Sequence, residues 1–131
     1  MSTVNQMVIK SSAGSDVFRV GPRQGDYLTL EFEGHSLRAV SKIYLYDDNS
    51  SLLKLFENLG QNWKGWEGVK SWSSLEGDFT LSCSADKLGH VFMAIELVNR
   101  TVEPNWTIKT SLQIDSGSLE TVLSQAKSLL G

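Results

Sequence analysis

The chain of 131 residues contains one cysteine and two histidines, too few for most metal sites or for a disulfide framework. A single thiol cannot form a disulfide within the chain. Cys83 stands at an apolar position of the alternating segment 79–84, where a free cysteine behaves as a small hydrophobic residue. His35 and His90 are not spaced as a pair on a helix. We therefore expect no metal site and no cofactor.

The sequence also lacks the short motifs of common enzymes. It has no Gly-x-Ser-x-Gly segment, no Gly-x-Gly-x-x-Gly segment and no phosphate-binding loop. Catalytic triads are assembled in space, so an enzyme would still need His35 or His90 within hydrogen-bond reach of a carboxylate or of Cys83. Both histidines fall at predicted turns or strand starts, where a solvated histidine is the usual case. We predict that the protein is not an enzyme.

Runs of positive charge and long hydrophobic stretches are missing as well. The net charge is −3, and Lys and Arg occur singly, which argues against a nucleic-acid partner. No stretch approaches the roughly 18 apolar residues of a membrane span, and residues 1–12 lack the basic start and apolar centre of a signal peptide. These absences predict a cytoplasmic protein with no membrane partner. The length predicts a single domain over residues 1–131.

Alternating apolar residues dominate what the sequence does contain. A period of two predicts β-strands, because successive side chains of a strand point to opposite faces. The pattern recurs in segments 28–33, 37–46, 79–84, 91–98 and 106–114, with weaker candidates at 7–10 and 16–20. Leu37 begins the predicted inward face of its segment. Gly34 and His35, just before it, form a predicted two-residue hairpin loop.

Two segments carry apolar residues at helical spacing, 52–59 and 119–130. Polar residues 47–50 are predicted to begin the first helix, because short polar side chains accept from its unpaired N–H groups, and Gly60 ends it. Short loops between strands imply antiparallel pairing. We predict an α+β fold, with a mainly antiparallel sheet of about six or seven strands and two amphipathic helices packed on one face.

The two halves of the sequence echo each other at a constant offset. Leu45, Asp48, Ser51 and Leu52 recur sixty-seven residues later as Leu112, Asp115, Ser118 and Leu119. Two strand–strand–helix repeats would explain this echo. A second explanation is that any junction between a strand and a helix favours leucine, aspartate and serine at such places. The sequence leaves both explanations open.

Three of the four tryptophans lie close together in the connector 61–76, between a predicted helix and a predicted strand. Trp63, Trp66 and Trp72 are interspersed with glycines. Long loops are usually either tied to the core or functional, and aromatic residues beside charges such as Glu67 are common in protein-binding hot spots. Packing onto the core is the favoured role and partner binding is the alternative, and the two can coexist.

Glu76 and Asp78 follow the connector two residues apart, so their side chains share one face at the start of a predicted strand. The favoured interpretation is a solvated strand start. The alternative is an acidic binding spot or a pair of carboxylates for acid–base chemistry.

The connector also carries a resemblance. Residues 63–68 read WKGWEG and residues 72–78 read WSSLEGD. A W-x-G-W-x-G segment followed by W-x-S-L-E resembles a family of small bacterial proteins of unknown function, over about residues 26–130. The order of elements is also similar to that of WapI-type immunity proteins, which neutralise the toxin domain of a contact-delivered or secreted bacterial toxin.

This resemblance implies a non-enzymatic protein that binds and blocks a cognate toxin domain. Many such toxins are basic nucleases, and an acidic binder would capture them faster. The residues proposed to contact the partner on this basis are Trp66, Glu67, Trp72, Glu76 and Asp78. Neither family supplies an established catalytic residue, and the oligomeric state is left open.

A small-ligand-binding or sensor domain is the alternative function. Tyr44, Tyr46 and Phe92 occupy predicted outward positions that are more apolar than solvent favours. These side chains would line a pocket on the open face of the sheet. A hollow of several hundred Å³ at that place would favour this alternative.

Overall fold

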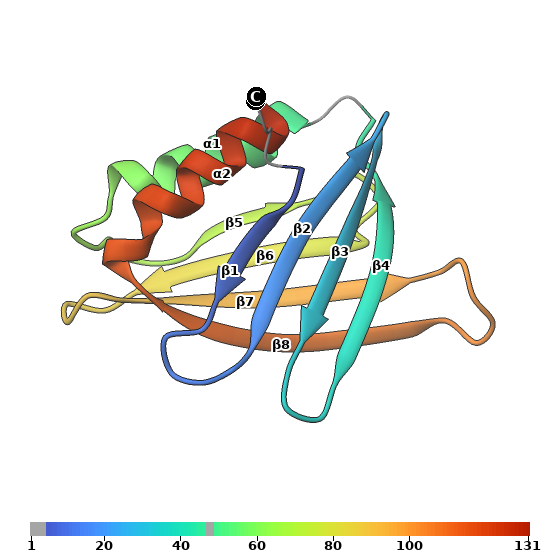
Figure 1. The fold of residues 1–131 in the computed structure, drawn as a ribbon, viewed down its shortest axis with the longest axis horizontal. Coiled ribbons are helices and arrows are strands. Elements are labelled where there is room, and N and C mark those ends of the chain that lie inside the picture. The colour runs from blue at the N-terminus through green and yellow to red at the C-terminus, as the bar shows by residue number, and fades with distance from the viewer. Residues whose placement is uncertain (1–4, 47–48) are drawn as a thin grey trace.

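The computed structural model describes residues 5–46 and 49–131. Within them the chain forms the same order of elements twice, four strands and then a helix (Figure 1). The first half contains β1 (Met7–Lys10), β2 (Val17–Gln24), β3 (Tyr27–Glu33), β4 (Arg38–Tyr44) and α1 (Asn49–Gln61). The second half contains β5 (Lys70–Ser73), β6 (Phe79–Ala85), β7 (His90–Asn99), β8 (Trp106–Asp115), the short 3-10 helix η1 (Ser116–Ser118) and α2 (Leu119–Leu130).

The predicted α+β class is confirmed, but the single sheet of six or seven strands is wrong. The described residues form two antiparallel sheets of four strands, in the orders β1-β2-β3-β4 and β5-β6-β7-β8. Neighbouring strands within each sheet are joined by short connections, which suit antiparallel pairing. Helix α1 stands between β4 and β5 and separates the two sheets along the chain. The one strand not among the seven predicted segments is β5. It lies inside the tryptophan connector, which was predicted to be a loop.

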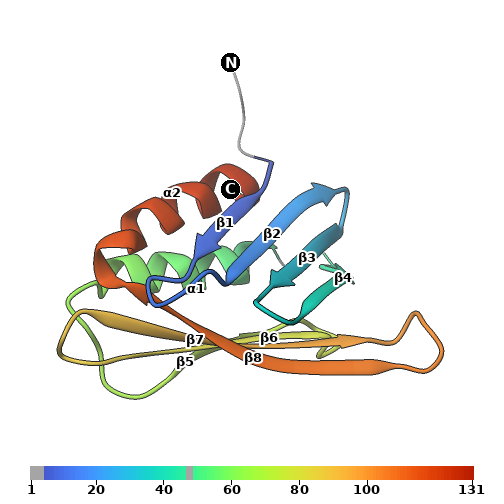
Figure 2. The same cartoon turned by 60° about the horizontal axis from the view of Figure 1, so that its bottom comes forward.

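The two sheets cross each other, and the two helices lie side by side next to the first sheet (Figures 1 and 2). Figure 2 shows the second sheet as the lower layer, with the helices and the first sheet above it. Helix α1 contacts α2 and β5, α2 contacts β1, and β4 contacts β7. Each half therefore packs against the other through both its sheet and its helix.

One hydrophobic core fills the space between these layers. The alternation predicted for β3 and β7 is confirmed, because their inward side chains are all buried. The rings of Phe18 in β2 and Phe79 in β6 lie 5.8 Å apart between centroids and join the two sheets. The helix faces predicted around Leu52 and Leu119 are also part of this core.

Several local predictions differ from the structure. Leu37 is 41% exposed, not inward, because the turn after β3 is longer than two residues. The N–H of Gly34 donates to the carbonyl of Leu37 at 2.7 Å and closes this turn. The proposed helix start at Asp47 and Asp48 lies outside the described residues. The repeated unit is four strands and a helix, twice as many strands as predicted.

None of the helices in the described part of the chain has the length and apolar character needed to cross a bilayer.

Candidate functional site

The five residues predicted to bind a partner lie in three separate places. Trp72 belongs to the core: it is 9% exposed, and its ring lies 5.5 Å from that of Phe79 between centroids. Its indole N–H donates to the hydroxyl of Ser51 in α1 at 2.7 Å. Burial with a satisfied N–H is the usual state of a structural tryptophan. Trp72 therefore fastens β5 to α1 and presents little surface to a partner.

Trp66 and Glu67 lie at one end of the second sheet, where β5 begins and β6 ends. Trp66 is half-buried, its indole N–H donates to the carbonyl of Cys83 at 3.3 Å, and the ammonium of Lys70 lies 5.8 Å from its ring centroid. Glu67 is exposed. Both residues line an open hollow of about 440 Å³ together with residues 85–87 of the turn after β6. Trp66 therefore holds the connector while leaving part of its ring accessible.

Trp63 is the tryptophan that faces solvent. Its side chain is 53% exposed, and the ammonium of Lys64 lies 5.4 Å from its ring centroid. Trp63 is not among the residues predicted to bind a partner, although Trp63 and Trp66 both stand among glycines and nothing in their spacing separates them. The exposure of Trp63 and the partial burial of Trp66 depend on where α1 ends and on how the connector folds.

Glu76 and Asp78 lie at the opposite end of the second sheet, in the turn between β5 and β6. Lys70 pairs with Cys83 at the end that carries Trp66 and Glu67, and Ser73 pairs with Thr80 at the end that carries Glu76 and Asp78. The seven residues of β6 span about 20 Å at the usual rise of a strand. The predicted residues thus do not form one compact site.

Arg100 and Tyr46 organise the two carboxylates. The guanidinium of Arg100, which follows β7, pairs with the carboxylate of Asp78 and donates to the carbonyl of Glu76 at 3.2 Å. The hydroxyl of Tyr46, which follows β4, donates to Glu76 Oε1 at 2.5 Å. This hydrogen bond raises the pKa of Tyr46 above its ordinary value of 10.0, because the neutral phenol is the donor.

All three tyrosines of the chain meet beside these groups. The ring of Tyr44 lies 5.0 Å from that of Tyr27 and 4.3 Å from that of Tyr46 between centroids, both in edge-to-face arrangement. The hydroxyl of Tyr44 donates to Asp26 Oδ2 at 3.2 Å. Tyr27 and Tyr46 remain 49% and 47% exposed. We name the tyrosine–carboxylate surface by its members, which are Tyr27, Tyr44, Tyr46, Asp26, Glu76, Asp78 and Arg100.

Exposed apolar side chains flank this surface. Leu75, beside Glu76 in the same turn, is 71% exposed, and Val102, two residues after Arg100, is 42% exposed. Tyrosine and arginine are enriched at the centres of protein interfaces, and exposed apolar residues beside them add to the area that a partner can cover. The arrangement therefore has the composition of a protein-binding surface.

From the sequence, Glu76 and Asp78 were assigned to a partner-binding site and Tyr44 and Tyr46 to a separate ligand pocket. Asp26, Tyr27 and Arg100 were missed. Glu76 and Asp78 stand out by their spacing, but Tyr46 meets Glu76 across thirty positions of the sequence. Arg100 meets Glu76 across twenty-four. The outward alternation of Tyr44 and Tyr46 was a signal for exposed aromatic residues, although it could not say what they contact.

The histidines differ from each other. His35 is exposed, whereas His90 Nδ1 lies 2.7 Å from Asp86 Oδ2. Asp86 Oδ1 also accepts the N–H groups of Leu88 and His90, so the pair closes the turn between β6 and β7. The hydrogen bond from the His90 N–H is the main cause that lowers the pKa of Asp86 below its ordinary value of 3.8.

Neither a thiol nucleophile nor a metal cluster accompanies this pair in the described residues. Burial raises the pKa of Cys83 to about 12, so its thiol stays protonated at neutral pH. Across residues 5–46 and 49–131, no group of three or more His, Cys, Asp or Glu side chains is placed to hold a metal ion. The pair of His90 and Asp86 therefore has a structural explanation as a turn closure.

Among the comparisons with known proteins, a match to a protein family assigns the chain. Searches of curated proteins and of solved structures give no match. Residues 15–131 match the profile of a family of unknown function, DUF6228, which confirms the resemblance to a family without an assigned function. The likeness to WapI-type immunity proteins stays a prediction. Because the match covers most of its length, the chain belongs to DUF6228, a family of unknown function.

Proposed function

We propose that this protein is a non-enzymatic, cytoplasmic protein-binding domain that acts as an immunity protein. In this proposal it binds a cognate bacterial toxin domain and blocks it through the tyrosine–carboxylate surface. The observation that carries the proposal is the gathering of Tyr27 and Tyr46, both about half exposed, beside Glu76 and Arg100. Tyrosine supplies a large contact area with little side-chain freedom to lose on binding.

The charge of the surface favours a basic partner. Asp26, Glu76 and Asp78 contribute three carboxylates, and Arg100 contributes one guanidinium. The excess of negative charge agrees in sign with the net charge of −3 of the whole chain. Opposite charges on two binding surfaces increase the rate of association and disfavour partners of the wrong sign. A toxin domain with an exposed lysine- or arginine-rich face fits this surface best.

The side chains of this surface are already held in place, which supports binding of a partner without rearrangement of the surface. Each carboxylate has a partner within the protein, and the three rings pack edge to face. Side chains that are already held lose less freedom when a partner covers them. The same contacts join the first sheet to the turn between β5 and β6, so the surface has a rigid support.

The five residues first proposed for the interface have different parts in this proposal. Glu76 and Asp78 contact the partner, and Trp72 supports β5 from the core. Trp66 and Glu67 lie at the far end of the second sheet and outside the contact area. The pair of His90 and Asp86 meets the geometric condition that an enzyme would need, but in this proposal it serves to close a turn. The buried thiol of Cys83 supports a protein without a thiol nucleophile.

A direct test takes the proteins encoded by the genes beside that of this chain as candidate toxins. We expect co-expression to rescue growth of cells that make the toxin, and calorimetry to give a specific complex. Tyr46→Ala and Glu76→Lys should each raise the Kd by about tenfold or more, the usual effect of changing a hot-spot residue. Glu67→Lys makes the same change of charge at the opposite end of the sheet and should leave the Kd within about twofold.

Two results would overturn the proposal. Failure of every neighbouring gene product to bind, with no rescue of growth, would remove the immunity role. Equal weakening by Glu67→Lys and Glu76→Lys would move the interface away from the tyrosine–carboxylate surface. Circular dichroism of each variant shows whether the fold is kept.

The sheet-face pocket proposed for a small ligand receives less support. Tyr44 and Tyr46 pack with Tyr27 at the end of the first sheet. Phe92 lies in β7 of the second sheet, 38% exposed, beside an open hollow of about 280 Å³. These three side chains belong to different sheets and different surroundings, so the site proposed for them is not the one that the geometry favours.

A further inference from the structure

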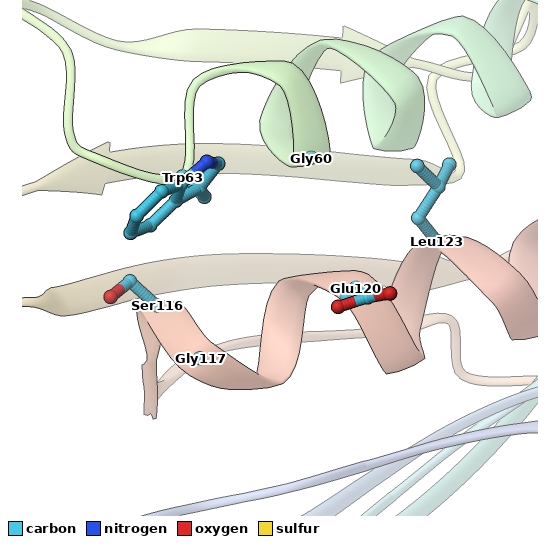
Figure 3. A pocket seen from close by; sticks show the side chains of 6 residues that line it. All are labelled: Gly60, Trp63, Ser116, Gly117, Glu120 and Leu123. Carbon is cyan, nitrogen blue, oxygen red and sulfur yellow. The ribbon is translucent and has the colours of Figure 1, made fainter.

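A separate hollow of about 460 Å³ lies between the end of α1 and the start of α2. Figure 3 shows Trp63 reaching from the connector toward η1, while Glu120 and Leu123 come from α2. The residues that line the hollow are Gly60, Trp63, Ser116, Gly117, Glu120 and Leu123. None of them belongs to the tyrosine–carboxylate surface, so an inference about this hollow does not depend on the proposed function.

Both walls of the hollow are held in place by contacts outside it. On the connector side, the N–H of Gly65 donates to the carbonyl of Asn62 at 2.9 Å and closes the turn that carries Trp63. The side-chain amide of Asn62 donates to the carbonyl of Asn58 at 2.8 Å and fixes this turn to the end of α1. On the other side, the N–H of Ser116 donates to the carbonyl of Gly89 at 2.8 Å.

The two glycines of the hollow have different effects. A Cβ on Gly60 would stand 2.8 Å from Leu123 Cδ2, so glycine lets Leu123 come close to α1 and form the floor between the helices. A Cβ on Gly117 would meet no atom within 4 Å and would point into open space. The hollow is therefore present in the protein before any ligand binds, which lowers the cost of binding.

The lining combines an aromatic face with a carboxylate. Trp63 is 53% exposed, and its ring already has the ammonium of Lys64 at 5.4 Å from the centroid, a distance typical of cation–aromatic attraction. Glu120 is exposed and has no ion-pair partner among the residues that the structure describes. An indole face and a carboxylate together attract organic cations and repel anions. The ammonium of Lys64 places a positive charge near the same ring, but Lys64 is not among the residues that line the hollow, so Glu120 is the charged group of the lining.

We propose that this hollow binds a small organic cation, an amine joined to an aromatic or aliphatic body. The apolar body packs against the Trp63 ring and the Leu123 side chain. The ammonium group pairs with the Glu120 carboxylate, and the hydroxyl oxygen of Ser116 accepts a further N–H. Burial of the apolar body supplies most of the binding free energy, and Glu120 selects the sign of the charge.

A titration of the nitrogen-15-labelled protein followed by NMR tests this site. The probe is phenethylamine, a cation at neutral pH, and the matched control ligand is phenylpropionate, an anion of similar size. We expect phenethylamine to shift the indole N–H signal of Trp63 and the amide signals of Gly117 and Glu120 with saturation. The other three indole signals serve as internal references, and the Trp63→Phe variant assigns the signal.

Two variants connect the binding to the lining. Glu120→Gln should weaken binding of phenethylamine by about fivefold or more, because the ion pair is lost while the shape is kept. Glu103→Gln, the same change on an exposed loop far from the hollow, should leave the affinity unchanged. Gly117→Leu should abolish binding, because a Cβ at this lining position meets no atom within 4 Å and the rest of the side chain would occupy the hollow.

The proposal is overturned if phenylpropionate binds as tightly as phenethylamine, or if the saturating shifts arise at residues away from this hollow. It is also overturned if Glu120→Gln and Gly117→Leu, both shown to be folded by their NMR spectra, bind phenethylamine like the unchanged protein.

Discussion

Among single residues, Tyr46 makes the contact that joins the two halves of the chain at the tyrosine–carboxylate surface. It stands just after β4 with a positive φ of 51°, a conformation that costs a residue with a Cβ about 1–2 kcal/mol. Its ring packs on Tyr44, and its hydroxyl donates to Glu76 in the second half. The packing and the hydrogen bond offset this strain and hold the exposed ring in one position.

The contact between Tyr46 and Glu76 predicts a change in the titration of this tyrosine. Glu76→Ala removes the acceptor and its charge, so the pKa of Tyr46 should fall toward its ordinary value of 10.0. A raised pKa in the folded state means that the contact stabilises the protein below about pH 10 and that this stabilisation is lost as the pH rises further. The chemical shift of the Tyr46 ring carbon, followed against pH, measures the effect. Glu67→Ala is the control, and an identical Tyr46 titration in both variants would contradict this account.

Residue types alone could predict which side chains were suited to binding or packing but not which of them would be exposed. Trp63, Trp66 and Trp72 have the same chemistry, yet their exposure runs from 53% for Trp63 to 9% for Trp72. Burial of Trp72 depends on Ser51 in α1, and partial burial of Trp66 depends on a carbonyl of β6. These partners lie about twenty residues away in sequence, beyond the reach of local patterns.

At the scale of elements, β2 contains an irregularity in its pairing with β3 that its sequence only hints at. The register of β2 against β3 shifts between Val20 and Arg23, and Gly21 within this interval has a φ of 116°. A Cβ on Gly21 would lie 2.6 Å from the carbonyl oxygen of Asn5, a backbone atom that has no side-chain freedom to move away. Glycine at this position lets the chain before β1 pass close to β2.

Replacing this glycine should therefore destabilise the protein strongly. We expect Gly21→Ala to lower the free energy of unfolding by about 2–4 kcal/mol, from the strain of positive φ together with the contact at Asn5. Urea denaturation followed by circular dichroism measures this loss. Gly14→Ala is the matched control, because a Cβ there meets no atom within 4 Å, and its effect should stay within about 1 kcal/mol. A loss for Gly21→Ala no larger than that for Gly14→Ala would contradict the proposed close approach.

Most elements were predictable because each strand or helix has enough residues to show its period. The short strand β5 was not, since it has four residues, KSWS, and only Trp72 among them faces the core. One buried residue defines no period. Its pairing with β6 is instead supported by side-chain contacts across the strands, including the hydroxyls of Ser71 and Ser82 at 3.1 Å.

For the whole molecule, the sequence predicts the class but not the division into two sheets. Alternation shows which residues of a strand face inward and says nothing about which distant strand lies beside it. The echo at an offset of sixty-seven residues was the one sequence signal of a division into two halves. In the fold, the repeated unit is longer than that echo. Four strands followed by a helix occur in both halves, and Leu45 and Leu112 are both buried at the equivalent junctions. This larger repeat favours duplication over a local preference at strand–helix junctions.

The two halves nevertheless share one core, and this arrangement has a consequence for unfolding. The rings of Phe18 and Phe79 meet between the sheets, and α1 packs on α2. Neither half can expose its inner face without exposing that of the other. A domain with one core of this kind unfolds in a single cooperative transition.

The distribution of aromatic residues allows this cooperativity to be tested. All four tryptophans follow α1, between residues 63 and 106 in the connector and the second half, while Phe18 lies in the first half. Phe18→Ala should lower the free energy of unfolding by about 3–5 kcal/mol, because it leaves a cavity in the shared core. If the halves unfold together, tryptophan fluorescence and circular dichroism shift to the same lower urea midpoint. Val40→Ala, on the exposed outer face of β4, should change the free energy of unfolding from either signal by no more than about 1 kcal/mol. A fluorescence midpoint that stays in place for Phe18→Ala, while the circular dichroism transition splits, would mean that the second half folds without the first.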